Sequence, residues 1–308
     1  IIKNNKIFNN GDSGIRDLMI LDNKIFVSYN ETPTSECFNT SIIVADLNLD
    51  NLIFSEFLTY DECASESNKK VSYNPVNAGS VLNSGGKMFS YKNEKILFTT
   101  GTYMDSVRAQ DAESKFGKIL LIDLKTKTHE LVSMGHRNPQ GLFYDKKNDV
   151  IISTEHGPRG GDEININRNV SSQEIENFGW PISSYGVHYD GIERKEAPLY
   201  KSHKDHGFIE PMKYYAPSIA ITEIIKIPKT FNEDFINDFF IGSMGSFIGE
   251  GDLSIHHIRF NSEFDKIDFE DIIPIGQRVR DLILLEKQKV VISILENTPA
   301  ISFLILNN

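Results

Sequence analysis

Residues 141–154 read Gly-Leu-Phe-Tyr-Asp-Lys-Lys-Asn-Asp-Val-Ile-Ile-Ser-Thr. The second apolar run, Val150 to Thr154, has β-branched residues at nearly every position, which is typical of a buried strand. The polar residues 145–149 separate it from the first apolar run and favour a tight turn. This stretch therefore predicts a hairpin of two antiparallel strands.

The same succession of strand, short polar turn and strand returns along the chain. Further copies occupy residues 14–29, 86–100, 218–242 and 278–295. Each copy is followed by more strand-like sequence, so a unit of roughly 45–50 residues recurs about five times. This period matches propeller blades of four antiparallel strands. A stack of parallel solenoid coils is the alternative, but parallel neighbours need longer crossovers than these turns provide.

The totals limit the class of protein. The chain has 308 residues, of which 40% are hydrophobic, enough for a large core. Length alone suggests about two domains, but all-β architectures often use this length for one, and we expect a single propeller domain over residues 1–308. The net charge of -11 argues against unspecific nucleic-acid binding. No run of about 18 apolar residues occurs, so we expect no membrane span.

The two cysteines, Cys37 and Cys63, lie in polar, turn-rich surroundings. A bridge between them would close a loop of about 25 residues and stabilise the fold by about 3 kcal/mol in the chain-entropy account. Two free thiols are the alternative. Two cysteines alone are too few for a structural zinc site.

Two polar clusters flank the strand at Val150 to Thr154, and they lie at or beyond the two ends of the predicted hairpin. Gly135 to Leu142 reads Gly-His-Arg-Asn-Pro-Gln-Gly-Leu, and Glu155 to Glu163 reads Glu-His-Gly-Pro-Arg-Gly-Gly-Asp-Glu. Loops held by a rigid sheet are where binding and catalytic residues concentrate. Turn punctuation alone would explain one such cluster. Two clusters at the ends of one strand predict a functional site.

At these two clusters, and at Phe178-Gly179-Trp180-Pro181, the sequence resembles the soluble quinoprotein sugar dehydrogenases, the glucose/sorbosone dehydrogenase-like or aldose sugar dehydrogenase family. The resemblance implies a six-bladed β-propeller of four-stranded antiparallel blades. Because the repeats number about five, the sixth blade is expected from Ser172 to Tyr215 or from the two termini. In the second case Ile1 to Phe8 would pair with the final strand and close the ring.

The resemblance also implies an activity. Members of this family bind pyrroloquinoline quinone (PQQ) and calcium at the centre of one face and oxidise the anomeric carbon of a small sugar, with an electron acceptor that this sequence leaves unspecified. They work mostly in the periplasm, so we expect a periplasmic or secreted protein, a setting that favours the bridge between Cys37 and Cys63. The chain begins at Ile1 without a charged and apolar leader, which is compatible with removal of a leader or with trimming.

Eight residues carry over to the cofactor or the metal, beginning with two pairs in the two polar clusters. Arg137 and Asn138 occupy family positions that contact the quinone, whose carboxylates and carbonyls suit a guanidinium and an amide. Gly157 and Pro158 match positions whose backbone carbonyls ligate calcium, an ion that takes six to eight oxygens. Arg137 would also stabilise the negative charge that develops on the quinone oxygen, which makes it a catalytic candidate.

His156 and Asp162 flank the calcium loop and face the cofactor in the family. His156 is the second catalytic candidate, because it is the plausible substitute base near the site. For each residue a structural role is the alternative. His156 would then be a satisfied histidine on a turn, and Asp162 would cap the next turn by accepting backbone N–H bonds.

Arg278 and Arg280 match a late Arg-x-Arg pair that binds cofactor carboxylates in the family. Alternation along a strand places both side chains on one face, so one anion can meet both. Surface ion pairs with Asp281 or Glu286 are the alternative.

The sequence departs from the family pattern where the chemistry is done. Asn83 occupies the position of the catalytic histidine, and an asparagine cannot take a proton from a sugar hydroxyl at neutral pH. The following strand ends at Thr99 to Thr102 instead of Gly-Asp, and Gly242 to Gly245 lacks the expected lysine. Two hypotheses therefore stand. The protein is a PQQ- and calcium-dependent sugar dehydrogenase, or it is an inactive propeller that binds a ligand or a protein.

Overall fold

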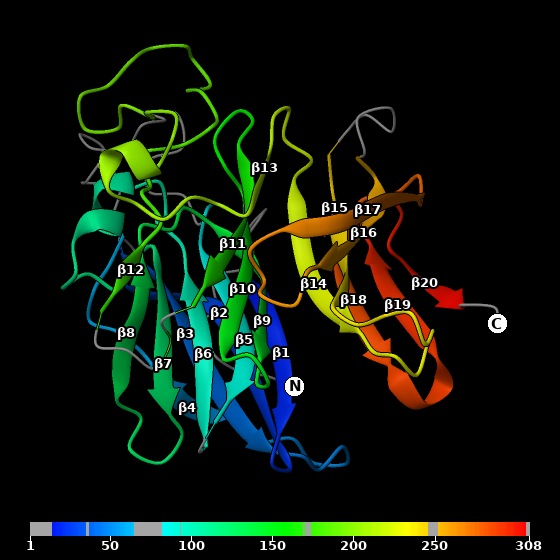
Figure 1. The fold of residues 1–308 in the computed structure, drawn as a ribbon. Helices are drawn as coiled ribbons and strands as arrows, with labels where there is room; N and C mark the ends of the chain where they lie inside the picture. Colours follow the sequence, from blue (N-terminus) through cyan, green and yellow to red (C-terminus); the bar gives the residue numbers. More distant parts are fainter. Residues whose placement is uncertain are drawn as a thin grey trace.

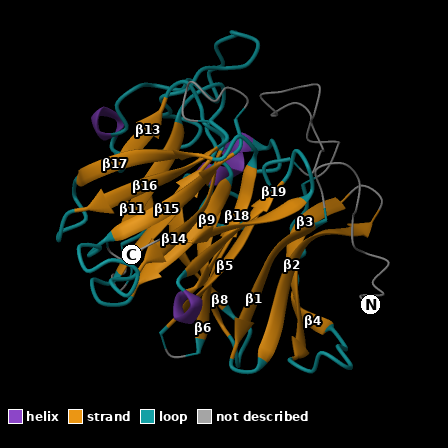
Figure 2. Ribbon diagram, turned by 90° about the vertical axis from the view of Figure 1, so that its right-hand side faces the viewer, coloured by secondary structure: helices purple, strands orange, loops and turns teal. Residues whose placement is uncertain are grey.

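The structure is a computed structural model that describes residues 14–34, 37–64, 82–92, 94–168, 170, 174–245 and 252–305. Strands make up nearly all of the regular structure (Figure 2). The helices in the described ranges are short 3-10 turns at Ser106–Gln110 (η2), Lys204–His206 (η3) and Glu286–Gln288 (η5). None of the helices in these ranges has the length and apolar character needed to cross a membrane.

Five sheets follow one another along the chain (Figure 1). The first contains β1 (Ile15–Leu21), β2 (Lys24–Thr34), β3 (Cys37–Asp46) and β4 (Ser55–Leu58). The second contains β5 (Gly85–Tyr91), β6 (Lys95–Thr100), β7 (Lys118–Asp123), β8 (His129–Met134) and β12 (Glu176–Asn177). The third contains β9 (Pro139–Asp145), β10 (Val150–Glu155), β11 (Asp162–Asn167) and β13 (Lys213–Tyr215). The fourth contains β14 (Ile221–Ile227), β15 (Asp238–Ser243), β16 (Ser254–Phe260) and β17 (Ile267–Pro274), and the fifth contains β18 (Val279–Leu285), β19 (Val290–Leu295) and β20 (Ala300–Ile305).

Each sheet is a blade built from antiparallel neighbours, with one exception, the short β12, which pairs in parallel with β8. The first strand of each blade is its innermost strand. Strands β1, β5, β9, β14 and β18 contact one another in this order and so surround a common axis. The hairpin predicted at residues 141–154 is confirmed as β9 and β10, and the antiparallel pairing excludes the solenoid alternative.

The expectation of six four-stranded blades is wrong. Five blades are present in the described ranges, and the fifth has three strands. The described residues from 174 to 215 form no blade of their own, because β12 extends the second sheet, β13 extends the third, and irregular loops at the top of Figure 1 connect the two. The proposed closing strand at Ile1 to Phe8 lies outside the described residues.

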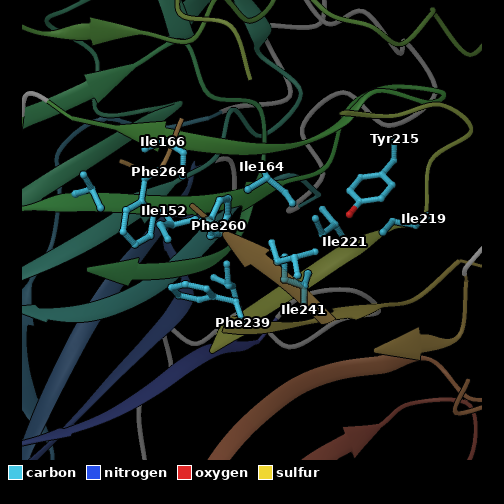
Figure 3. Close-up of a cluster of buried hydrophobic side chains, with 13 residues drawn as sticks. Ile152, Ile164, Ile166, Tyr215, Ile219, Ile221, Phe239, Ile241, Phe260 and Phe264 are labelled. Carbon is cyan, nitrogen blue, oxygen red and sulfur yellow. The ribbon is translucent and has the colours of Figure 1, made fainter. Parts of the chain in front are cut away.

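Apolar layers join neighbouring blades. A cluster of 13 buried side chains fills the space between the third and fourth sheets (Figure 3). Ile152, Ile164 and Ile166 reach it from the third sheet, and Phe239 and Phe260 from the fourth. Similar clusters join the first sheet to the second, the second to the third and the fourth to the fifth.

One face of the fifth blade is apolar and open. Ile283, Ile292 and Phe303 are cross-strand neighbours on β18, β19 and β20. Every second residue of β20 places its side chain on this face, and these side chains are largely exposed, with Ile301 at 60%, Phe303 at 63% and Ile305 at 62%. This blade therefore packs on one side only within the described part of the chain.

A buried ion-pair cluster lies on the axis. The Lys87 ammonium of β5 is 3.1 Å from Asp17 of β1 and 3.6 Å from Asp281 of β18, and it also pairs with Glu223 of β14. The pairing register shifts at this height in all four strands. Such bulges re-aim side chains, and here they turn four charged groups toward one another.

Cys37 and Cys63 form a disulfide, with their Cα atoms 5.0 Å apart. The bridge ties the start of β3 to the segment that follows β4. Next to it, Phe38 and Ala64 exchange two backbone hydrogen bonds of 2.9 Å. Of the two alternatives for the cysteines, the bridge is the one found.

Replacing Phe239 by alanine tests the inter-blade core. Phe239 is fully buried and makes edge contacts with Phe143, Phe260 and Phe264. The cavity and the lost transfer free energy should lower the free energy of unfolding by about 3–5 kcal/mol, measured by urea denaturation. Phe303→Ala is the control, since its ring is exposed. Equal losses for the two variants would contradict the burial assigned to Phe239.

Replacing Cys63 by serine tests the disulfide. Removal of a bridge with a sequence separation of 26 residues should lower the free energy of unfolding by about 3 kcal/mol. A reducing agent should destabilise the wild type by the same amount and leave Cys63→Ser unchanged. A reductant effect of similar size in the variant would show that the bridge is not its cause.

Candidate functional site

The two polar clusters meet at one end of the third blade. Arg137 and Asn138 lie in the turn between β8 and β9, and His156 to Gly161 form the turn between β10 and β11. Because β9 and β10 are antiparallel, the start of one lies beside the end of the other, and Glu155 pairs with Pro139. The sequence expectation that the clusters lie at the ends of this hairpin is therefore confirmed.

Arg137 is 5% exposed and is held on several sides. Its guanidinium donates to the carbonyl oxygen of His156 at 3.0 Å and lies over the Trp180 ring, 5.4 Å from the ring centre. Its backbone N–H donates to Glu155 at 2.6 Å, and its carbonyl accepts from the Thr102 N–H at 3.0 Å. A buried cation on an aromatic face is fixed in position, so it can meet an anion at little cost in entropy.

Glu155 organises this corner. One carboxylate oxygen accepts from His136 Nδ1 at 2.9 Å and from the Asn165 amide at 2.8 Å, and the other accepts from the Arg137 N–H. Burial opposes ionisation of Glu155, but His136 and the backbone donors outweigh it and hold the pKa of the carboxyl below its usual value. The His136 ring stacks on Phe178 with 4.9 Å between the centres and also contacts the Ser133 hydroxyl. His136 therefore has a structural role here.

In the loop after His156 the backbone of Gly157 lies very close to that of Gly161. A Cβ on Gly157 would lie 2.1 Å from the carbonyl oxygen of Gly161, so the turn requires glycine there. Asp162 accepts from the Gly157 N–H at 3.0 Å through one oxygen and from the Ile221 N–H at 3.1 Å through the other. Both oxygens of Asp162 thus accept hydrogen bonds from backbone N–H groups, which is the structural role that the sequence analysis gave as the alternative to cofactor binding. The bond to Ile221 also ties the loop to β14.

His156 points a ring nitrogen into the site. Its Nε2 is buried and has no hydrogen-bond partner among the described residues. Burial lowers the pKa of His156, and the positive charges of Arg137 and Arg280 lower it further, which together outweigh the opposing effects of Asp162 and of a hydrogen bond with the Ile221 backbone. The ring is therefore neutral at pH 7.

Asn138 connects the second and third blades. Its amide oxygen accepts from the Gly85 N–H at 3.2 Å and from the Gln140 amide at 2.9 Å. The oxygen is therefore committed to the fold, and the amide N–H₂ is the part of Asn138 that remains to contact a ligand.

Arg278 and Arg280 share one anion, as alternation predicts, but their partner is Glu296. Arg278 Nε lies 2.8 Å from one Glu296 oxygen, and an Arg280 nitrogen lies 2.6 Å from the other. Arg278 also donates to the Met244 carbonyl at 2.6 Å. Arg278 and Arg280 therefore pair with Glu296 and not with Asp281 or Glu286, the partners given as the alternative.

Asn83, at the position of the family's histidine, has a left-handed backbone with φ of 58°. Asparagine adopts this conformation more readily than most residues, and so does histidine. Its side-chain amide contacts the Met104 sulfur at 2.9 Å, and its carbonyl accepts from the Tyr103 N–H. The structure thus gives Asn83 local contacts and no acid–base partner among the described residues.

Trp180 is the site residue that the sequence left without a role. It is 4% exposed, carries the Arg137 guanidinium on its face, and gives its carbonyl to the Gln110 amide at 2.7 Å. A cavity of about 10 Å³ lies beside it, close to the minimum for one water molecule. Its lining includes Arg137, His156, Glu163, Trp180 and Ser183. The sequence does contain one signal for this residue, because Trp180 is the single tryptophan of the chain.

Three comparisons place this geometry among known proteins. A family model described as Glucose / Sorbosone dehydrogenase matches residues 1–299. Aldose sugar dehydrogenase YliI of Escherichia coli is 31% identical over 153 residues, which are 50% of this chain and 38% of that protein. The curated relatives are matched over only 33% to 40% of their own lengths.

Solved structures share the fold. A glucose dehydrogenase aligns with a TM-score of 0.79 at 20% identity, over 98% of this chain and 85% of that one. The PQQ-bound form of aldose sugar dehydrogenase from Streptomyces coelicolor aligns with a TM-score of 0.63 at 14% identity, over 96% of this chain and 77% of that one. At these identities the likeness is one of fold. The family match over residues 1–299 shows that this chain belongs to the glucose/sorbosone dehydrogenase family.

Proposed function

We propose that the protein is a sugar dehydrogenase-like oxidoreductase that binds PQQ and calcium and takes an aldose as its substrate. One observation carries the proposal. The buried Arg137 guanidinium, fixed on Trp180, lines the same cavity as His156, whose Nε2 has no hydrogen-bond partner among the described residues. Such a pairing of a rigid cation with a neutral ring nitrogen suits a planar anion that carries carbonyl oxygens. The PQQ-bound relative from Streptomyces coelicolor supports the choice of quinone.

The residues fit a quinone with several carboxylates. Arg137 supplies a guanidinium on one side of the site, and Arg278 and Arg280 supply two more from the fifth blade. The Asn138 amide and the His156 ring add neutral polar contacts. These five groups would hold the cofactor, and a bound quinone would supply the hydride acceptor.

The fit for calcium is partial. No backbone hydrogen bond from the described part of the chain reaches the carbonyl oxygens of Gly157 or Pro158. Unused carbonyls in a loop that Asp162 holds rigid are suitable calcium ligands. Calcium takes six to eight oxygens, so these two carbonyls would supply only part of its coordination.

Arg137 is the residue best placed for catalysis. Its guanidinium is desolvated and preorganised, so it would stabilise negative charge that develops on a ligand oxygen. Asn83 cannot act as the base. His156 is neutral at pH 7 and thus able to accept a proton, but its lowered pKa makes it a weak base. We therefore expect slow turnover.

A propeller that binds its ligand without turnover is the second candidate. The contact between the Asn83 amide and the Met104 sulfur favours it, because the position that should carry the base is occupied by a group engaged locally. Either candidate would work outside the cytoplasm. The Cys37–Cys63 bridge supports a periplasmic or secreted location, since disulfides persist in oxidising compartments.

Titration with PQQ in the presence of calcium tests the proposed site. A ligand at 100 times its dissociation constant stabilises the folded protein by about 2.7 kcal/mol, which raises Tm measurably. Arg137→Ala should abolish the rise because it removes the buried cation. Arg194→Ala is the matched control, since that arginine pairs with Asp190 in a loop outside the proposed contacts. A wild type that responds neither to calcium nor to PQQ would refute the quinone site.

Asn83→His tests whether the missing base limits turnover. The left-handed backbone at residue 83 accepts histidine, so the variant should fold. A positioned base contributes about 10²–10⁴ in rate, and aldose-dependent reduction of a dye should rise by a factor in this range. Asn23→His is the control, because Asn23 has the same φ of 58° in the turn between β1 and β2. No gain in a variant that still binds PQQ would show that the base is not what is missing.

A further inference from the structure

One carboxylate of the chain already occupies the arginine pair of the site. The two Glu296 oxygens accept from Arg278 and Arg280 separately, at 2.8 Å and 2.6 Å. The backbone brings them together, because the Glu296 N–H donates to the Arg278 carbonyl at 3.0 Å just beyond the pairing of Val279 with Leu295. Glu296 is thus placed opposite the pair by the β18–β19 hairpin.

The ion pairs of Glu296 with Arg278 and Arg280 are partly exposed to solvent, so a ligand can replace Glu296. Arg278, Arg280 and Glu296 are each about 35–40% exposed at the side chain. Ion pairs with this much solvent contribute little net stability. The charge on Glu296 is nonetheless maintained, because burial is outweighed by hydrogen bonds from Arg280 and Arg278 that lower its pKa.

A ligand carboxylate would need the same donors. Arg278 gives its Nε to Glu296 and another nitrogen to the Met244 carbonyl, and Arg280 gives a nitrogen to the second Glu296 oxygen. Arg278 and Arg280 lie at or just before the start of the inner strand β18, as Asn138 lies just before the inner strand β9, and the neighbouring Asp281 faces Lys87 on the axis. The pair is therefore at the same end of the inner strands as the proposed site. An incoming carboxylate must therefore compete with Glu296.

We propose that Glu296 is an internal competitor that occupies the arginine pair in the ligand-free protein and is displaced by a carboxylate of the ligand. The inference rests on the proposed function, since it names what the arginine pair binds. It gives Glu296 a specific effect, which is to reduce the affinity of the site for anionic ligands. It also keeps the two guanidinium groups aligned with each other before the ligand arrives.

The test compares PQQ binding by the wild type and by Glu296→Gln, each with calcium. Glutamine keeps the size and one acceptor oxygen but removes the competing charge, so the dissociation constant should fall about fivefold. Glu286→Gln, in the same blade, is the matched control and should bind as the wild type does. The gain should disappear in the double variant Arg280→Ala with Glu296→Gln.

A second probe separates competition from a structural role. The trimethyl ester of PQQ carries no carboxylate, so Glu296→Gln should bind it no more tightly than the wild type does. An equal gain for the acid and the ester would overturn the proposal, as would unchanged or weaker binding of the acid by a variant that melts at the wild-type temperature.

The outcomes separate this proposal from the proposed function. Binding by the wild type without a gain in Glu296→Gln refutes the competitor role and leaves the quinone site standing. Binding by Glu296→Gln alone supports the competitor role. Binding by neither protein refutes both.

Discussion

Four of the five blades depend on one buried cation. The Lys87 ammonium lies on the axis among Asp17, Glu223 and Asp281, and the innermost strands that carry these residues are held at one height by it. Burial raises the pKa of Glu223 to about 8, in spite of the neighbouring Lys87, so the cluster carries fewer than three full negative charges at neutral pH. Removing one partner of a buried ion pair typically costs about 3–5 kcal/mol, which makes this cluster the centre of the assembly.

The first residues of the inner strands contribute side chains both to the Lys87 cluster on the axis and to the candidate site. Gly85, two residues before Lys87, donates its N–H to Asn138, and Arg280 faces Glu296 while the next residue, Asp281, faces Lys87. Arg137, Arg278 and Arg280 all lie at or just before the starts of inner strands, in a protein whose net charge is -11.

Local pattern determined the blades and the position of the two polar clusters. The β-branched run from Val150 to Thr154 and its polar turn could form little else than a hairpin strand, and the five repeats correspond to the five sheets. The two polar clusters were placed correctly because a hairpin brings its own ends together. These inferences succeed because the contacts involved link residues that are close in sequence.

Only the tertiary structure decided what depends on distant contacts. It paired β12 with β8 and β13 with β11, so the two strands of the segment that was expected to form a sixth blade extend the second and third sheets instead. It gave Asp162 the N–H of Ile221, a residue of the next blade. It paired Arg278 with Glu296 because the β18–β19 register sets them opposite each other, and it placed Trp180 beneath Arg137 through a loop that follows no period. The sequence alone fixes which residues are polar, charged or apolar, and the three-dimensional packing fixes which of them meet.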